Sequence, residues 1–196
     1  MNIVLITQIT PTEDNFNGPS ALMYHLLLHR ASDISVCIFT TNSNQVTDQE
    51  IDSIARKMNA KIEVFSTKKK SRLFAKQKVA HIFAKLKGEI EIPVRYTEKL
   101  PVWVLDKIQS IKPDLIWLYP HNCLGFIQQL EGYKMVVTGP DCASLHLSRA
   151  LRDSFVFRNN ADVSLSWNEL ILNYERELAK KQVLIHLVGN TDVDYF

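Results

Sequence analysis

The strongest constraint on the fold is a regular alternation between short apolar runs and longer amphipathic stretches. The runs are rich in β-branched residues and too short for helices, which is typical of strands buried on both faces of a sheet. They lie at residues 2–7 (NIVLIT), 34–40 (ISVCIFT), 61–65 (KIEVF), 115–119 (LIWLY), 135–138 (MVVT) and 184–188 (LIHLV).

The stretches between the runs carry helix signals. Thr47 and Glu50 have the spacing of a capping box, Gly88 suits the end of a helix, and Pro113 would stop one. We therefore expect helices at residues 21–30, 48–59, 68–87, 98–111 and 165–181. Strands alternating with helices predict βαβ units with right-handed crossovers, and so an α/β, Rossmann-like, doubly wound parallel sheet.

Composition excludes several classes of protein. Hydrophobic residues make up 46% and charged residues 22% of the 196, which is ordinary for a globular domain, and a net charge of +2 gives no overall case for nucleic acid. The three cysteines form no C-x-x-C pair, so we expect neither a disulfide framework nor a zinc site. The start, MNIVLITQ, is unlike a signal peptide, and no apolar run is long enough to span a bilayer, so we expect a cytoplasmic protein.

A binding site is expected at the carboxyl edge of the sheet. Ligands of open parallel sheets bind there, where the strand order reverses. If the order is 3-2-1-4-5-6, that point lies between the first and fourth strands. Gly18, His121 and Asp141 then lie one each in three converging loops, at residues 11–20, 120–123 and 139–144.

Gly18 is the candidate for phosphate binding. It precedes the first long helix, with Pro19 suited to the first helical position and Ser20 beside it. A glycine at a helix N-terminus lets a phosphate approach backbone N–H groups closely. The alternative is that Gly18 only makes a turn.

His121 and Asp141 are the candidates for chemistry. A histidine at this edge suits the orientation or deprotonation of an acceptor hydroxyl, and an aspartate suits hydroxyl binding or general-base work. The alternatives are a loop histidine without a role and an aspartate that caps a helix starting near Ser144. No G-x-G-x-x-G, Walker or H-E-x-x-H motif is present, so we expect no metal and no bound cofactor.

Residues 68–87 carry a dense positive charge. The apolar residues fall on one helical face, and a basic amphipathic helix of this kind suits an anionic membrane surface. The alternative is that the apolar face packs on the sheet while the basic side chains are only solvated. The candidate membrane contacts are Lys68, Lys69, Lys70, Arg72, Lys76, Lys78, Lys85 and Lys87.

Four segments of the chain carry a resemblance when they are taken together: residues 1–30, 112–122 (KPDLIWLYPHN), 134–152 and 173–196. They resemble the N-terminal domain of glycosyltransferase family four, whose members are retaining enzymes of the GT-B fold. The chain departs from the family pattern at Gly18, where two glycines are common, at Pro140, where many members have histidine, and at Asn190, where serine is usual.

The resemblance implies an acceptor-binding domain at residues 1–190. Its glycine loop would close over the diphosphate of a nucleotide sugar, which is the co-substrate held by a second, absent domain. Residues 191–196, with the helix-start pattern of Thr191 and Asp194, would begin the helix that leads to that domain. The fragment alone would then be inactive.

The resemblance also implies a site and a substrate class. Tyr119, at the exit of the fourth strand, and Ser144 join Gly18, Pro19 and Ser20 as expected donor-phosphate or acceptor ligands. The acceptor would be a glycan or a lipid-linked molecule, in polysaccharide or glycolipid synthesis, at or near the inner face of a membrane.

An alternative reading stays open. Thr7, Thr10 and Thr12 form a hydroxyl-rich series after the first strand, which is compatible with a flavodoxin-like nucleotide-binding module without transferase activity. A receiver-type domain is disfavoured, because acids would directly follow the first strand where Gln8 stands.

Overall fold

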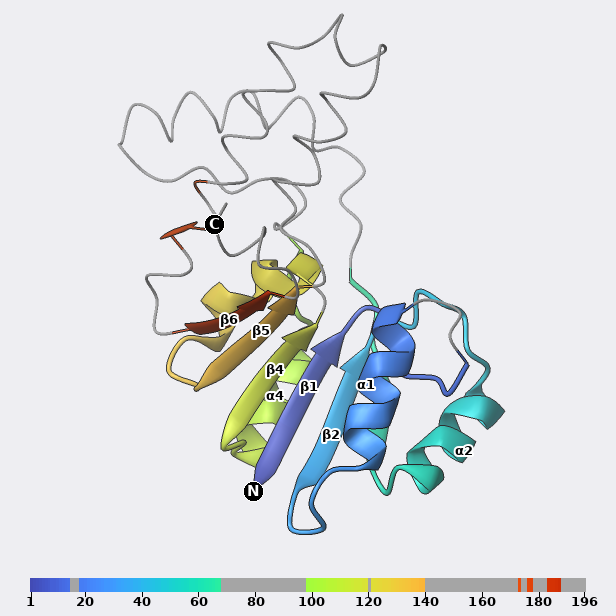
Figure 1. Ribbon diagram of the computed structural model, residues 1–196. Coiled ribbons are helices and arrows are strands. Elements are labelled where there is room, and N and C mark those ends of the chain that lie inside the picture. The colour runs from blue at the N-terminus through green and yellow to red at the C-terminus, as the bar shows by residue number, and fades with distance from the viewer. Residues whose placement is uncertain are drawn as a thin grey trace, which may run out of the picture.

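The protein is built on a six-stranded parallel sheet (Figure 1). The computed structural model describes residues 1–14, 18–67, 98–119, 121–139, 173, 176–177 and 183–187, in a few places by their backbone only. The strands run in the order β3-β2-β1-β4-β5-β6, and each pairs in parallel with its neighbour. They are β1 (Asn2–Thr7), β2 (Ser35–Thr40), β3 (Lys61–Val64), β4 (Leu115–Tyr119), β5 (Met135–Gly139) and β6 (Val183–Leu187).

The predicted α/β fold is therefore confirmed, with the strand order on which the site prediction depends. β1 is an interior strand with β2 on one side and β4 on the other; Leu5, for example, is opposite Ile38 and Trp117. Its side chains from Val4 to Thr7 are fully buried. A strand enclosed on both faces needs this continuous apolar run, because an alternating pattern would bury polar groups.

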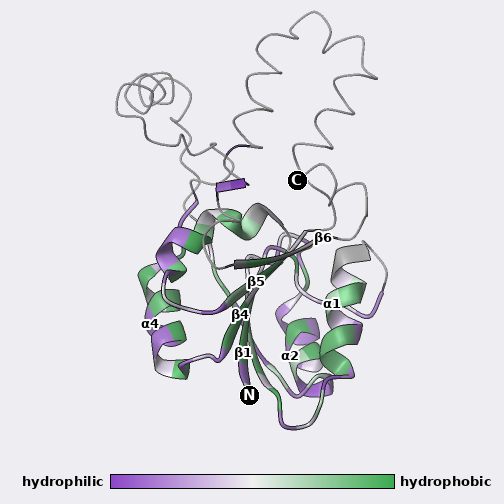
Figure 2. Cartoon of the chain, turned by 60° about the vertical axis from the view of Figure 1, so that its left-hand side comes forward, coloured by the Kyte–Doolittle hydropathy of each residue, from purple (hydrophilic) through white to green (hydrophobic). Residues whose placement is uncertain are grey.

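Helices cover both faces of the sheet (Figure 2). α1 (Gly18–Leu28) and α2 (Asp48–Lys57) lie over one face, and α4 (Val102–Ile111) lies over the other with the 3-10 helix η2 (His121–Leu130). Each face has its own apolar cluster. The first centres on Leu5, Met23, Tyr24, Leu27, Ile38 and Tyr119, and the second on Ile6, Phe39, Val104, Ile108, Leu118, Phe126 and Ile127.

The start of α2 follows directly from the sequence. The Thr47 hydroxyl accepts a hydrogen bond from the backbone N–H of Glu50, and the Glu50 carboxylate accepts one from the backbone N–H of Thr47 at 2.9 Å. The predicted capping box is thus present. The helix ends at Lys57, two residues before the predicted end, because Asn59 takes a positive φ of 46° that ends the helical path.

Two other helices differ from prediction at their ends. α4 starts at Val102 rather than at residue 98, because Pro101 holds an extended conformation as the residue before the helix. It stops where Lys112 turns left-handed before Pro113, as expected. α1 starts at Gly18, three residues earlier than predicted, so the glycine lies in the first turn itself.

Other predicted elements lie wholly or largely outside the described residues. These are the basic helix at 68–87, the helix start at 191–196 and most of the helix at 165–181, of which residues 173, 176 and 177 are helical. Among the helices that the structure describes, none combines the length and apolar character required to cross a bilayer.

The packing of β1 gives a stability prediction. Leu5→Ala removes a fully buried side chain from the interior strand and should lower the free energy of unfolding by about 2–5 kcal/mol. Leu22→Ala is the matched control, since Leu22 on α1 is 41% exposed and its truncation should cost well under half as much. Urea unfolding followed by circular dichroism measures both, and equal losses would contradict this packing.

Candidate functional site

The candidate site is the carboxyl edge of the sheet where β1 and β4 lie side by side. Thr7, the last residue of β1, is paired with Tyr119, the last residue of β4. The chain after β1 enters α1 at Gly18 on one face, and the chain after β4 enters η2 at His121 on the other. This divergence is the strand-order switch at which open α/β sheets bind ligands.

The predicted site residues are described to different extents. The backbone of Gly18, Pro19 and His121 is placed at this edge, but the side chains of Pro19 and His121 lie outside the described part of the chain. Asp141 and Ser144 also lie outside them. The structure therefore brings the starts of α1 and η2 to one edge and leaves the Asp141 segment undescribed.

Ser20 is fully buried and shapes the loop before α1. Its hydroxyl accepts a hydrogen bond from the backbone N–H of Thr12 and donates one to the backbone carbonyl of Thr10, both at 2.9 Å. The Thr12 hydroxyl lies 2.7 Å from the same oxygen. Ser20 therefore ties the loop to the first turn of α1, and its hydroxyl is engaged within the protein.

Tyr119 packs in the core. Its side chain is 1% exposed and belongs to the apolar cluster under α1, with its ring edge-on to Trp117 at 5.9 Å between centroids. Burial raises the pKa of its phenol, so the hydroxyl is protonated at neutral pH. In this structure the ring is part of the sheet–helix interface, at the position where β4 ends.

A polar network joins the loop after β1 to the loop after β2, and the sequence did not predict it. Thr10 is fully buried; its hydroxyl donates to Asn42 Oδ1 at 2.8 Å and its backbone N–H donates to Asn44 Oδ1 at 2.9 Å. The Asn44 side-chain amide returns a bond of 3.0 Å to the Thr10 carbonyl. Asn44 thus satisfies both backbone groups of a residue that has left the sheet.

Backbone contacts extend the same link. Thr41 N–H donates to the Thr7 carbonyl at 3.1 Å, and Ser43 N–H donates to the Gln8 carbonyl at 2.8 Å. Asn42 adopts a positive φ of 52°, a conformation that asparagine tolerates better than most residues. Two sequence features could have predicted this link: the N-x-N pattern that follows the second strand, and the threonine series that follows the first strand.

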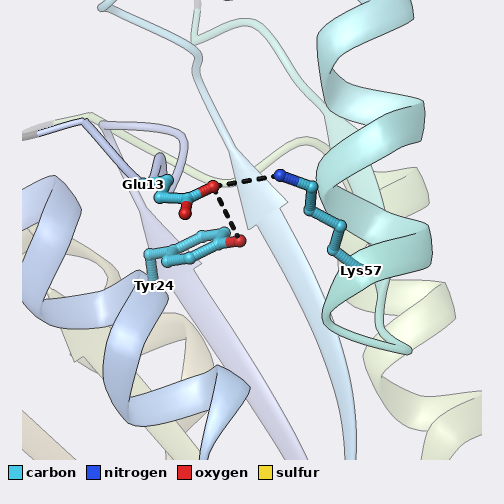
Figure 3. A network of polar contacts seen from close by, with 3 residues as sticks. All are labelled: Glu13, Tyr24 and Lys57. Atoms are coloured by element: carbon cyan, nitrogen blue, oxygen red, sulfur yellow. Dashed lines mark hydrogen bonds and ion pairs between the residues drawn. The ribbon is translucent and has the colours of Figure 1, made fainter.

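The outer end of the loop is held by an ion pair (Figure 3). Glu13 Oε2 accepts hydrogen bonds from Lys57 Nζ at 3.0 Å and from the Tyr24 hydroxyl at 3.5 Å. The hydrogen bond and charge of Lys57 lower the pKa of Glu13, and Glu13 in turn raises the pKa of Lys57. Both groups are therefore charged at neutral pH.

Two cysteines are unsuited to nucleophilic chemistry. Cys37 and Cys123 are buried free thiols. Burial raises the pKa of Cys37 to about 11 and that of Cys123 to about 12, so almost no thiolate forms at neutral pH. Within the described part of the chain, no cluster of three or more histidine, cysteine or acidic side chains is placed to hold a metal ion.

The contacts of the Glu63 carboxylate indicate a structural role. Glu63 is partly buried on β3, where burial raises its pKa but the hydrogen bond from Lys107 and the ion pair with Lys61 outweigh that effect and lower it. Lys107 also lies over the Trp103 ring, 5.2 Å from its centroid. These contacts attach α4 to the outer strand, away from the β1–β4 switch.

Comparison with known proteins adds no family to this picture. The sequence matches no protein-family model, and a search of curated proteins returned no match.

The polar network gives a testable coupling. Thr10→Val keeps the side-chain shape but removes the hydroxyl, which should lower the free energy of unfolding by about 1–3 kcal/mol. In the double variant, Asn42→Ala should lower the free energy of unfolding by less than it does in the wild type, with a coupling energy of roughly 0.5–3 kcal/mol. Denaturant unfolding of the four proteins measures it, and strict additivity would rule out the Thr10–Asn42 bond.

Burial of the thiols gives a second test. In the folded protein at pH 8, iodoacetamide should label Cys37 and Cys123 only as fast as the protein opens, because each thiol is buried and its pKa is raised. In denaturant both should react fully. Mass spectrometry of proteolytic peptides distinguishes each cysteine, and rapid labelling of either one without denaturant would contradict its placement.

Proposed function

We propose that this chain is the acceptor-side, Rossmann-like domain of a GT-B glycosyltransferase. The enzyme would move a sugar from a nucleotide-sugar donor to a glycan or lipid-linked acceptor. The observation that carries the proposal is the start of α1 at Gly18, beside the β1–β4 switch and after a loop whose inner part is hydrogen-bonded through Thr10 and Thr12. The four family-like segments lie in the expected order along the chain.

The electrostatics of α1 suit a donor diphosphate. The first backbone N–H groups of a helix have no partner within it, and the helix dipole places a partial positive charge at that end. α1 has no acidic residue in its first turn that would repel an anion. The internal bonds of Thr10, Thr12 and Ser20 order the approach to this turn in advance, which reduces the entropy lost on binding.

The roles of His121 and Asp141 follow from the resemblance and from their positions in the chain. His121 starts η2 directly beyond β4, and Asp141 comes two residues after the end of β5. His121 would orient or deprotonate the acceptor hydroxyl, and Asp141 would bind a hydroxyl or act as a base. A second domain would supply the nucleotide site, so no resident metal or cofactor is required of this half.

The threonine series favours this proposal over a flavodoxin-like phosphate loop. The hydroxyls of Thr7, Thr10 and Thr12 all make hydrogen bonds within the protein. A hydroxyl-rich loop that bound phosphate directly would need such groups to face the ligand. In this protein the three hydroxyls stabilise the conformation of the loop instead.

Location belongs to the same proposal. An enzyme with a lipid-linked acceptor would act in the cytoplasm at the inner membrane face, and the eight basic residues between Lys68 and Lys87 have the charge for that contact. The segment lies outside the described residues.

The test is an activity assay on the protein encoded by the complete reading frame. It should release nucleoside diphosphate from one member of a panel of UDP-, GDP- and ADP-sugars. Gly18→Asp, which adds an anion where the diphosphate would lie, and Asp141→Ala should each lower kcat/KM by at least about tenfold. Asp52→Asn, an exposed change on α2, is the control and should retain activity.

The 196-residue chain alone should show no turnover, because half of the cleft would be missing. Two results would overturn the proposal: absence of release from every donor, or wild-type rates in both site variants.

A further inference from the structure

The loop after β1 is anchored at three points of decreasing burial. Thr10 is bound to the β2–α2 loop, Thr12 is bound to Ser20, and Glu13 is bound to Tyr24 and Lys57. We infer that the contacts of Glu13 with Lys57 and Tyr24 set the resting conformation of this loop at the candidate site. The inference about the conformation of the loop stands by itself; only the identity of the ligand that the loop would contact rests on the proposed function.

Glu13 contacts one side chain from each of two helices. Tyr24 belongs to α1 and Lys57 to α2, and one carboxylate oxygen receives both donors (Figure 3). The Tyr24 ring is buried, so its hydroxyl is a fixed point on the helix surface. We call this three-residue contact the Glu13 clasp. It is the last side-chain anchor of the described loop before residues 15–17 lead to Gly18.

The strength of the clasp suits reversible release. The Glu13 and Lys57 side chains are 62% and 58% exposed, and exposed ion pairs of this kind shift an equilibrium only a few-fold. Thr10, by contrast, is fully buried and multiply bonded. The outer part of the loop can therefore detach and reattach while the inner part stays ordered.

The charges around Glu13 define the conditions in which the clasp holds. Lys57, Tyr24 and His25 face it from the helices, and Asp14 follows it in the chain. The pKa of Glu13 is lowered in the folded protein, so ionised Glu13 stabilises the loop. This stabilisation is complete at pH values above the ordinary carboxyl pKa and is lost as the pH falls through the lowered pKa. The Glu13–Lys57 pair should therefore stay charged between pH 5 and 9, judged from the ordinary carboxyl pKa of about 4.3 and lysine pKa of about 10.4.

Hydrogen–deuterium exchange of the 196-residue chain tests the clasp directly. Glu13→Gln and Lys57→Gln should each speed exchange in peptides spanning residues 8–20 by about 2- to 5-fold, with the sheet peptides unchanged. Arg56→Gln removes the same charge one residue away and should leave the loop unchanged. The swap of Glu13→Lys with Lys57→Glu restores an ion pair and should recover most of the protection.

Salt provides an independent readout. Raising NaCl from 0.05 to 0.5 M should speed loop exchange in the wild type but not in Glu13→Gln, because screening acts on the pair. Unchanged exchange in both single variants, or no recovery in the swap, would overturn the inference. These outcomes do not depend on sugar transfer, so a clasp confirmed in a protein without nucleotide-sugar activity would separate the two proposals.

Discussion

The whole arrangement depends on the enclosure of β1 between two parallel neighbours. Its backbone groups are satisfied by β2 and β4, and its side chains from Val4 to Thr7 are buried by helices on both faces. Parallel pairing sends every strand out at the same edge, so the chain must turn there and return as a helix. The carboxyl edge, where the candidate site lies, is thus a consequence of how the sheet is buried.

The same constraint explains the polar network. A chain that leaves an apolar sheet carries backbone groups that still need partners near the interior. For Thr10, just beyond β1, these partners are Asn44 of the next loop and Ser20 of the next helix, while Asn42 accepts a hydrogen bond from the Thr10 hydroxyl. The loop that leads to Gly18 therefore has a graded structure, from buried hydrogen bonds at Thr10 to an exposed ion pair at Glu13.

The strands could be predicted because a strand that is buried on both faces needs a continuous run of apolar residues. The bounds of β1 and β4 agree with the predicted runs, whereas α1 and α4 differ by three or four residues at their starts, where Gly18 and Pro101 decide the local backbone. The Thr10 contacts join residues 32 and 34 positions apart and have no local signature. Tyr119 ends β4 as the sequence predicts, and the packing of its ring in the apolar cluster with Met23, Tyr24 and Leu27 of α1 has no local signature.

Our central proposal is that the start of α1 at the carboxyl edge would receive a donor diphosphate. The most direct measurement is a crystal structure of the full-length protein grown with a nucleoside diphosphate. The account predicts phosphate density facing the backbone of Gly18, on the β1–β4 side of the sheet. Density at the opposite edge, near Asp33 and Asp114, with the Gly18 turn empty, would contradict it.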